Sequence, residues 1–395
     1  MASGGGGTLL PAWSARSDAH NTDVPLSSAA PPPVSPRGFE VAGAAPPSQR
    51  PSQRRRLACF IALGVVIVAL LVAVAVAGAE SYARGGWNTA STTYPLRFQV
   101  IGDWGRQGAG NQSLVAELMG SVADLRPPHF VISTGDNFYK SGLTGTDDPL
   151  FDASFSRVYT QEGLQVPWHA VLGNHDYCDS SVNGTVNGTA VSPLHQLNIE
   201  LTNQDQRWHL ERAYVESFVG GRVQIFFIDT SPFITEYYTK FVEKGYNCSG
   251  GLAEQSWQAQ LLELERKLHR SAAEWKLVVG HHPPLSSGEH GNNKELLQHL
   301  QPLLQKYGVQ AYFAGHDHDM ECLAAEGYHI VVSGAGSETN RTQGTPNPGS
   351  TFYWPYSGFV AVRLEADSMR VDFHTLDGGT QPAFTSTIPR RGTQA

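Results

Sequence analysis

Short apolar runs that stop abruptly at a glycine are the feature that most constrains the fold. Seven short apolar runs of the chain have strand length and are rich in β-branched and aromatic residues. They are RFQVI (97–101), HFVIS (129–133), WHAVL (168–172), VQIFFI (223–228), WKLVV (275–279), VQAYFA (309–314) and YHIVVS (328–333). Helix-like stretches at 111–125, 252–270 and 294–307 separate several of them. This alternation predicts an α/β fold with helices covering the sheets, and a closing hairpin at 357–377 predicts mixed sheets.

Five of these runs end in Gly followed within two residues by Asp, Asn or His. The turns are Gly102-Asp103-Trp104-Gly105, Gly135-Asp136-Asn137, Gly173-Asn174-His175-Asp176, Gly280-His281-His282 and Gly315-His316-Asp317-His318. Ligands of open α/β sheets bind beyond the carboxyl ends of the strands, so the turns are expected to meet at one site. One Gly-Asp pair alone is ordinarily a turn or a helix cap. Likewise, an isolated histidine such as His129, His169 or His195 is ordinarily structural.

The side chains in these turns are carboxylates, an amide and imidazoles, and Tyr139 follows Asp136 by three residues. Hard oxygen donors combined with borderline nitrogen donors suit Fe, Mn or Zn better than Ca²⁺. None of the turns contains cysteine, which argues against a thiolate site. The alternative for Tyr139 is a packed aromatic ring whose hydroxyl bonds a backbone group.

The blocks GDWG, GDNFY, GNHD, GHHP and GHDH, in this order, resemble the calcineurin-like metallophosphoesterase family. Together they are most similar to its purple acid phosphatase branch, of the small tartrate-resistant type, over roughly residues 95–375. The resemblance implies a sandwich of two mixed β-sheets flanked by α-helices (αββα) in a single catalytic domain at 96–385. It also implies hydrolysis of phosphate monoesters by a hydroxide bound to a binuclear Fe(III)–M(II) centre, where M is Fe, Zn or Mn.

The resemblance assigns expected roles to particular residues of this chain. The ferric ion is expected on Asp103, Tyr139 and His318, the divalent ion on Asn174, His281 and His316, and Asp136 between the two. His175 and His290 match histidines that the family places near the substrate phosphate, where they are expected to act in catalysis. All nine positions carry the residue type that the family pattern requires.

Two other functions remain open: a phosphodiesterase on the same metal platform, and an ectodomain that kept the fold without turnover. The expected substrates are small phosphate monoesters or a phosphoprotein. The net charge is −8 and the chain has no basic cluster outside Arg54–Arg56, which argues against a nucleic-acid partner.

The N-terminal part predicts a membrane anchor. Residues 1–56 are rich in Gly, Ala, Ser and Pro and are expected to form a disordered tail. The uncharged run at 57–79 is long enough for a transmembrane helix. Because Arg54–Arg56 precede this run, the tail is expected in the cytosol, and the catalytic domain, after a linker at 80–95, in the lumen or outside the cell. A cleaved signal peptide is the alternative.

Other features agree with this single-pass type II topology. Sequons for N-glycosylation occur at Asn111, Asn183, Asn187, Asn247 and Asn340, and the segment 178–191 resembles a glycosylated surface insertion. Beyond residue 80 the cysteines are Cys178, Cys248 and Cys322. An oxidising compartment permits one disulfide among them, and the sequence leaves the pairing open. Residues 386–395 are expected to be a flexible C-terminus.

Overall fold

Two seven-stranded sheets form the centre of the structure, a computed structural model that describes residues 93–178, 185–239, 248–339 and 342–391. The strands of the first sheet are, in spatial order, β16 (Phe384–Pro389), β15 (Ser368–Thr375), β14 (Gly358–Leu364), β1 (Leu96–Ile101), β2 (Phe130–Ser133), β3 (Trp168–Ala170) and β6 (Trp208–Leu210). The strands β1, β2, β3 and β6 run parallel, whereas β14, β15 and β16 pair antiparallel.

The second sheet repeats this mixed arrangement. Its strands are, in spatial order, β13 (Ser350–Trp354), β11 (Met320–Ala325), β12 (Tyr328–Ser333), β10 (Ala311–Ala314), β9 (Trp275–Val279), β8 (Val223–Phe227) and β7 (Tyr214–Phe218). The central strands β8, β9, β10 and β12 run parallel, and β7, β11 and β13 pair antiparallel at the edges. The hairpin of β4 (Thr185–Val186) and β5 (Thr189–Ala190) stands apart.

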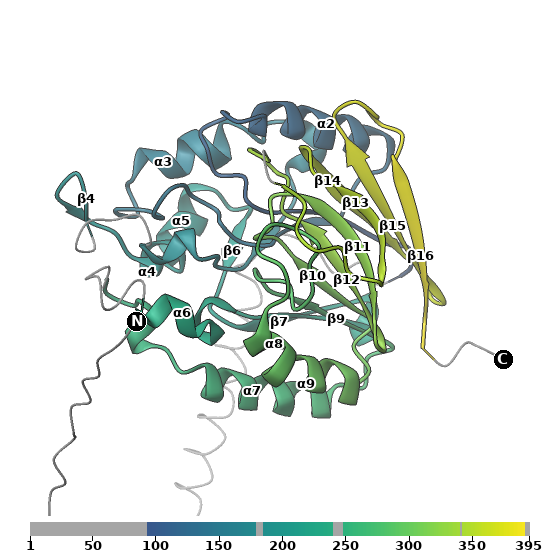
Figure 1. Ribbon diagram of the computed structural model, residues 1–395. Coiled ribbons are helices and arrows are strands. Elements are labelled where there is room, and N and C mark those ends of the chain that lie inside the picture. Colours follow the sequence, from purple (N-terminus) through teal and green to yellow (C-terminus); the bar gives the residue numbers. More distant parts are fainter. Residues whose placement is uncertain (1–92, 179–184, 240–247, 340–341, 392–395) are drawn as a thin grey trace, which may run out of the picture. The chain divides into compact units, whose positions relative to one another are not determined.

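Helices cover the outer faces of the two sheets (Figure 1). The helix α2 (Gln112–Leu125) lies over the first sheet, and α7 (Trp257–Arg270), α8 (Lys294–His299) and α9 (Gln301–Lys306) lie over the second. Shorter helices lie in the connections: α3 (Pro149–Phe151), α4 (Pro193–Gln196), α5 (Ile199–Gln204) and α6 (Thr235–Tyr237). Single turns of 3₁₀ or π helix occupy Asp152–Ser156, Glu162–Leu164, His175–Tyr177, Val219–Gly221, Ser231–Phe233 and Leu252–Glu254.

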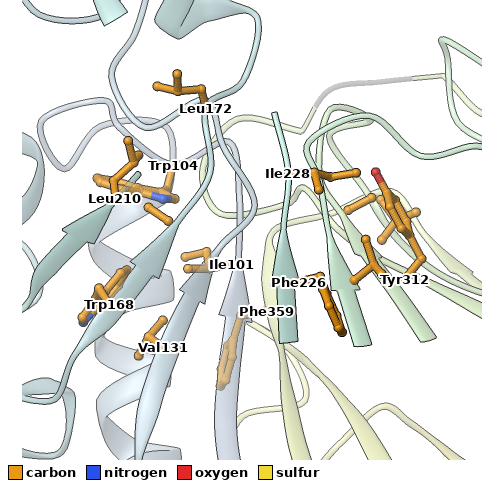
Figure 2. Close-up of a cluster of buried hydrophobic side chains, with 14 of the residues drawn as sticks. Ile101, Trp104, Val131, Trp168, Leu172, Leu210, Phe226, Ile228, Tyr312 and Phe359 are labelled. Atoms are coloured by element: carbon orange, nitrogen blue, oxygen red, sulfur yellow. The ribbon is translucent and has the colours of Figure 1, made fainter. Parts of the chain in front are cut away.

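Alternating side chains of the strands fill two kinds of hydrophobic core, one between the two sheets and one between each sheet and the helices that cover it. Phe98 of β1 and Phe313 of β10 meet between the sheets, with ring centroids 5.8 Å apart. The alternate positions point outward to the helices, as for Val131 in the first sheet and Tyr312 in the second (Figure 2). Since both faces of the central strands are buried, these strands read as nearly continuous apolar runs.

The predicted αββα sandwich is confirmed, and so are the seven predicted strands and the hairpin of β14 and β15. Two helices differ from their predicted bounds. The stretch 294–307 forms α8 and α9 because Pro302 lacks the N–H that a continuous helix needs. The stretch 252–270 is a 3₁₀ turn followed by α7, which begins after the N-cap Ser256.

The chain remains in the first sheet beyond residue 385, where the catalytic domain was predicted to end. Strand β16 pairs with β15 as far as Pro389, so the expected flexible C-terminus at 386–395 is wrong for the residues up to 389.

A disulfide joins Cys178 to Cys248, and Cys322 is a buried free thiol. The predicted tail (1–56), membrane span (57–79) and most of the linker lie outside the described residues. Within the ranges that the structure describes, every helix is too short or too polar to cross a bilayer.

Candidate metal centre

The five predicted turns come together at the carboxyl ends of the strands of both sheets. The turns after β1, β2 and β3 leave the first sheet, and those after β9 and β10 leave the second. Asp103, Asp136 and His316 have φ angles of 60°, 52° and 70°, a left-handed conformation that costs a non-glycine residue about 1–3 kcal/mol. Such strain at three neighbouring turns is typical of a functional site.

Glycines let the turns approach closely enough to converge. A Cβ atom on Gly173 would lie 2.1 Å from Asp136 Oδ1 and 2.4 Å from the Asp136 backbone nitrogen. Gly135 has a φ of +100°, and a Cβ there would lie 2.8 Å from His281 Nδ1. The glycines that mark the motifs are therefore needed for contact between turns far apart in sequence.

One group of donors gathers around the hydroxyl oxygen of Tyr139. This oxygen lies 3.2 Å from Asp103 Oδ1, 3.1 Å from Asp136 Oδ2 and 3.0 Å from His318 Nε2. The four side chains are buried. The guanidinium of Arg106 stacks on the Tyr139 ring, 3.7 Å from its centroid, and also pairs with Glu338.

A second group of donors surrounds the amide oxygen of Asn174. His281 Nε2 lies 3.1 Å from Asn174 Oδ1, and His316 Nδ1 lies 3.0 Å from the same oxygen. The Nδ1–H of His281 donates to the carbonyl of Thr134 at 2.9 Å, which leaves the Nε2 lone pair directed to the group. A histidine whose other ring nitrogen is held on a backbone carbonyl has the arrangement usual for a metal ligand.

Asp136 lies between the two groups of donors. Its Oδ2 is the oxygen near Tyr139, while its Oδ1 lies 3.5 Å from His281 Nε2. The Oδ1 atom also accepts the backbone N–H of His175 at 2.9 Å. One carboxylate therefore presents a separate oxygen to each group.

Burial makes the carboxylate of Asp103 costly to ionise without a nearby cation. It raises the pKa of Asp103 to about 7, and the charge of Asp136 adds to this effect while His281 opposes it. The pKa of His316 lies well below the usual value, chiefly because of burial and then because of the neighbouring histidines. A buried anionic oxygen beside neutral imidazoles is an environment that favours a cation.

The two histidines predicted to act in catalysis border the donor groups. The Nδ1–H of His175 donates to the carbonyl of Lys140 at 2.8 Å, and Nε2 lies 3.9 Å from Asp136 Oδ2. The His290 ring lies 4.1 Å from the His316 ring, centroid to centroid, and its Nδ1 contacts Asp317 Oδ1 at 2.8 Å. The carboxylate of Asp317 thus orients His290.

A cleft of about 510 Å³ opens beside the second donor group. Asn174, His290 and His316 line one part of it, and Tyr237 and Lys294 line another. Its volume is in the range of small-molecule sites, and it gives the donor groups access to solvent.

Three residues that organise the site had no role predicted from the sequence. Asp176, buried in the GNHD turn, accepts the backbone N–H of Gly173 at 2.8 Å and of Asn137 at 3.1 Å, which ties two turns together. His282 contacts Thr230 Oγ1 at 2.8 Å and Tyr237 Oη at 2.7 Å through its two ring nitrogens, so it is held in place rather than presented as a donor. The third is Arg106, whose guanidinium stacks on the Tyr139 ring. Asp176 and His282 stand within the quoted motifs, but their contacts with Asn137, and with Thr230 and Tyr237, join segments that are distant in sequence.

Known proteins are similar to this chain in sequence and in fold. Residues 96–320 match the calcineurin-like phosphoesterase family. Purple acid phosphatase 3 of Arabidopsis thaliana is 40% identical over 296 residues, which cover 73% of this chain and 77% of that protein. Tartrate-resistant acid phosphatase type 5 of Oryctolagus cuniculus is 31% identical over 319 residues, 76% of this chain and 92% of that protein.

Among solved structures, GAP50, described as the anchor in the inner membrane complex of Plasmodium, is similar with a TM-score of 0.58. The two chains are 23% identical, over 76% of this chain and 90% of that one, so this likeness concerns the fold alone.

The family match and the relatives define the class of protein. The chain belongs to the calcineurin-like phosphoesterase family. Its relatives are purple acid phosphatases, including the tartrate-resistant type, and the chain is an acid phosphatase of this branch.

Proposed function

We propose that this acid phosphatase hydrolyses phosphate monoesters at a binuclear Fe(III)–M(II) centre held by the two donor groups. The observation that carries the proposal is the position of Asp136, whose Oδ2 faces Tyr139 and whose Oδ1 faces His281. Asp103, Tyr139 and His318 would hold the ferric ion, because a phenolate and carboxylates are hard anionic donors. Asn174, His281 and His316 would hold the divalent ion, which is Fe, Zn or Mn.

The residues fit such a pair of cations. With its Nδ1–H on Thr134 and no proton on Nε2, as a metal ligand requires, His281 would turn a lone pair toward Asn174 Oδ1 and Asp136 Oδ1, and both of these atoms would face it as acceptors. Three acceptors directed at one another are repulsive unless a cation lies among them.

When bound, two such cations would lower the pKa of water and neutralise charge on a phosphoryl group. The protein groups around them have separate tasks. His175 and His290 would donate a proton to the leaving alkoxide, because a general acid must lie within hydrogen-bond reach of the atom that it protonates. Asp317 accepts from Nδ1 of His290, which reserves Nε2 for that transfer. Asp176 holds the turns of Asp136 and Asn174 in register.

Replacing the carboxylate between the donor groups tests the proposal. Asp136→Asn keeps the shape but removes the charge and one strong donor, so we expect kcat to fall by at least about 100-fold in folded protein. Detergent-solubilised full-length protein is assayed with a chromogenic phosphate monoester, and circular dichroism confirms the fold. Retention of a tenth of the wild-type rate would refute the role of Asp136. The corresponding diester is assayed in parallel, and a faster wild-type rate on it would show a phosphodiesterase instead.

We also propose that residues 57–79 anchor the enzyme in a membrane, with the catalytic domain in the lumen of the secretory pathway or outside the cell. The uncharged run, the preceding arginines and the sequons support this topology. The Cys178–Cys248 disulfide agrees with it, since disulfides form mainly in oxidising compartments. Extraction with alkaline carbonate should leave the expressed chain in the membrane pellet. Treatment with endoglycosidase should remove its N-linked glycans and lower its apparent mass on a gel. Release into the supernatant would contradict the anchor.

A further inference from the structure

A second group of metal-binding side chains lies away from the candidate metal centre, on the inner side of the two sheets. His169 of β3 and His209 of β6 are register partners in the first sheet, and Glu216 comes from β7 of the second sheet. One ligand atom from each residue lies within 4.8 Å of the others. We refer to these three residues as the inter-sheet cluster.

His169 shows the clearest sign of a missing partner. Its side chain is 7% exposed, and neither ring nitrogen makes a hydrogen bond to any residue that the structure describes. Nε2 of His209 likewise has no hydrogen-bond partner among those residues. Buried imidazole nitrogens are ordinarily bonded, because an unpaired polar group in an apolar setting costs about 1–3 kcal/mol.

The surroundings of the cluster are aromatic. The His169 ring lies 5.4 Å from the ring of Phe130 and 5.8 Å from that of Phe227, centroid to centroid. The carboxylate of Glu216 is the nearest charge, with Oε1 at 3.4 Å from His209 Nε2 and at 4.0 Å from His169 Nδ1. Glu216 and His209 are about one third exposed, which leaves a route from solvent.

The geometry points to a zinc site: we propose that His169, His209 and Glu216 bind one Zn²⁺ that links the two sheets. Two imidazoles and one carboxylate are a common ligand set for zinc, with water in the fourth position. In a tetrahedral site with metal–ligand distances of about 2.0–2.1 Å, neighbouring ligand atoms lie roughly 3.4 Å apart. The distance between His209 Nε2 and Glu216 Oε1 has this value, and a bound ion would draw the partly exposed Glu216 side chain closer to His169, whose Nδ1 lies 4.0 Å from Oε1.

The ionisation of the cluster is compatible with this role. Burial lowers the pKa of His169 to about 3, with a smaller effect from His209, so its imidazole is neutral and can be a ligand. Burial, together with the charge of Glu211, raises the pKa of Glu216 to about 7. A bound cation would compensate the carboxylate charge that this environment disfavours.

Metal content tests the proposal. Full-length protein in mild detergent is equilibrated with ZnSO₄, freed of unbound metal by gel filtration, and analysed for zinc and iron per chain. His209→Ala and Glu216→Gln alter partly exposed side chains and are expected to fold. His269→Ala, which removes an exposed histidine of α7, is the matched control. We expect the wild type and the control to carry about one more zinc per chain than the two cluster variants, with equal iron in all four.

Thermal unfolding gives a second measurement. Zinc should raise the midpoint of the wild type and of His269→Ala by several degrees more than that of the cluster variants, because an ion bound to the folded state stabilises it. Phosphatase activity should be the same in all four proteins, since the cluster lies outside the proposed binuclear centre. Equal zinc content in all four proteins would overturn the proposal, as would an equal zinc-induced shift. A water molecule would then be the better occupant of the cluster.

Discussion

At the scale of single residues, the role of Tyr139 can be judged only from the side chains that surround it in the structure. In the sequence it stands three places after Asp136, where a packed core tyrosine was an open alternative. In the structure its oxygen contacts Asp103, Asp136 and His318 rather than a backbone group. Burial and the two carboxylates raise the pKa of its hydroxyl well above the usual value, so ionisation to phenolate requires a strong positive charge at this point.

Tyr139→Phe removes the hydroxyl oxygen and keeps the aromatic ring, so it tests the phenolate donor separately from the packing of the ring. The ring contacts with Arg106 and His175 are kept, so we expect the protein to fold and to retain some metal through the remaining donors. The visible charge-transfer band that a ferric phenolate produces should disappear. Tyr237→Phe, which alters another buried tyrosine near the site, should keep the band. An unchanged spectrum in Tyr139→Phe would make this residue a structural aromatic.

At the scale of elements, the turns depend on glycines as much as on donors. A Cβ on Gly173 would meet the Asp136 backbone, which cannot move aside without shifting the turn after β2. Gly173→Ala should therefore lower bound metal, and should lower kcat at least tenfold, since a displacement of about 1 Å can cost about 100-fold in rate. Gly145→Ala, where the Cβ would meet the Asp147 carboxylate first, is the control and should retain both. Normal metal content in Gly173→Ala would contradict the account of close approach.

The elements also show what a sequence pattern can reveal. Apolar runs buried on both faces, such as that of β9, were predicted because their composition is distinct over five or more residues. The three-residue strand β6 and the half-exposed edge strand β13 have no comparable pattern and were missed. The donors of the candidate centre other than Tyr139 lie in turns that follow a strand-ending glycine, which is why the sequence pointed to them, and Tyr139 was predicted from the resemblance of the block GDNFY. The inter-sheet cluster was not, since His169 and Glu216 lie in different sheets and no spacing in the sequence relates them.

At the scale of the whole molecule, the disulfide connects the site to a distant part of the chain. Cys178 directly follows the turn that contains His175, and its partner Cys248 lies 70 residues away, shortly before α7. Closing a loop of this length stabilises a protein by on the order of 4 kcal/mol when the effect is attributed to the entropy of the unfolded chain.

Removing the disulfide should therefore destabilise the fold. The double variant Cys178→Ser with Cys248→Ser is expected to melt on the order of 10 °C below the wild type, as measured by circular dichroism. Cys322→Ala removes only the free buried thiol and should lower the melting temperature less. A double variant that melts within about 1 °C of the wild type would show that the crosslink contributes little.

We propose that a ferric ion bound by Tyr139 and a divalent ion share Asp136. The visible absorption spectrum of the purified full-length enzyme, taken with its iron content, tests this claim. We predict a purple protein with about one ferric ion per chain, whose band follows the bound iron and is lost when the iron is removed. Active enzyme that is colourless and free of iron would contradict the claim.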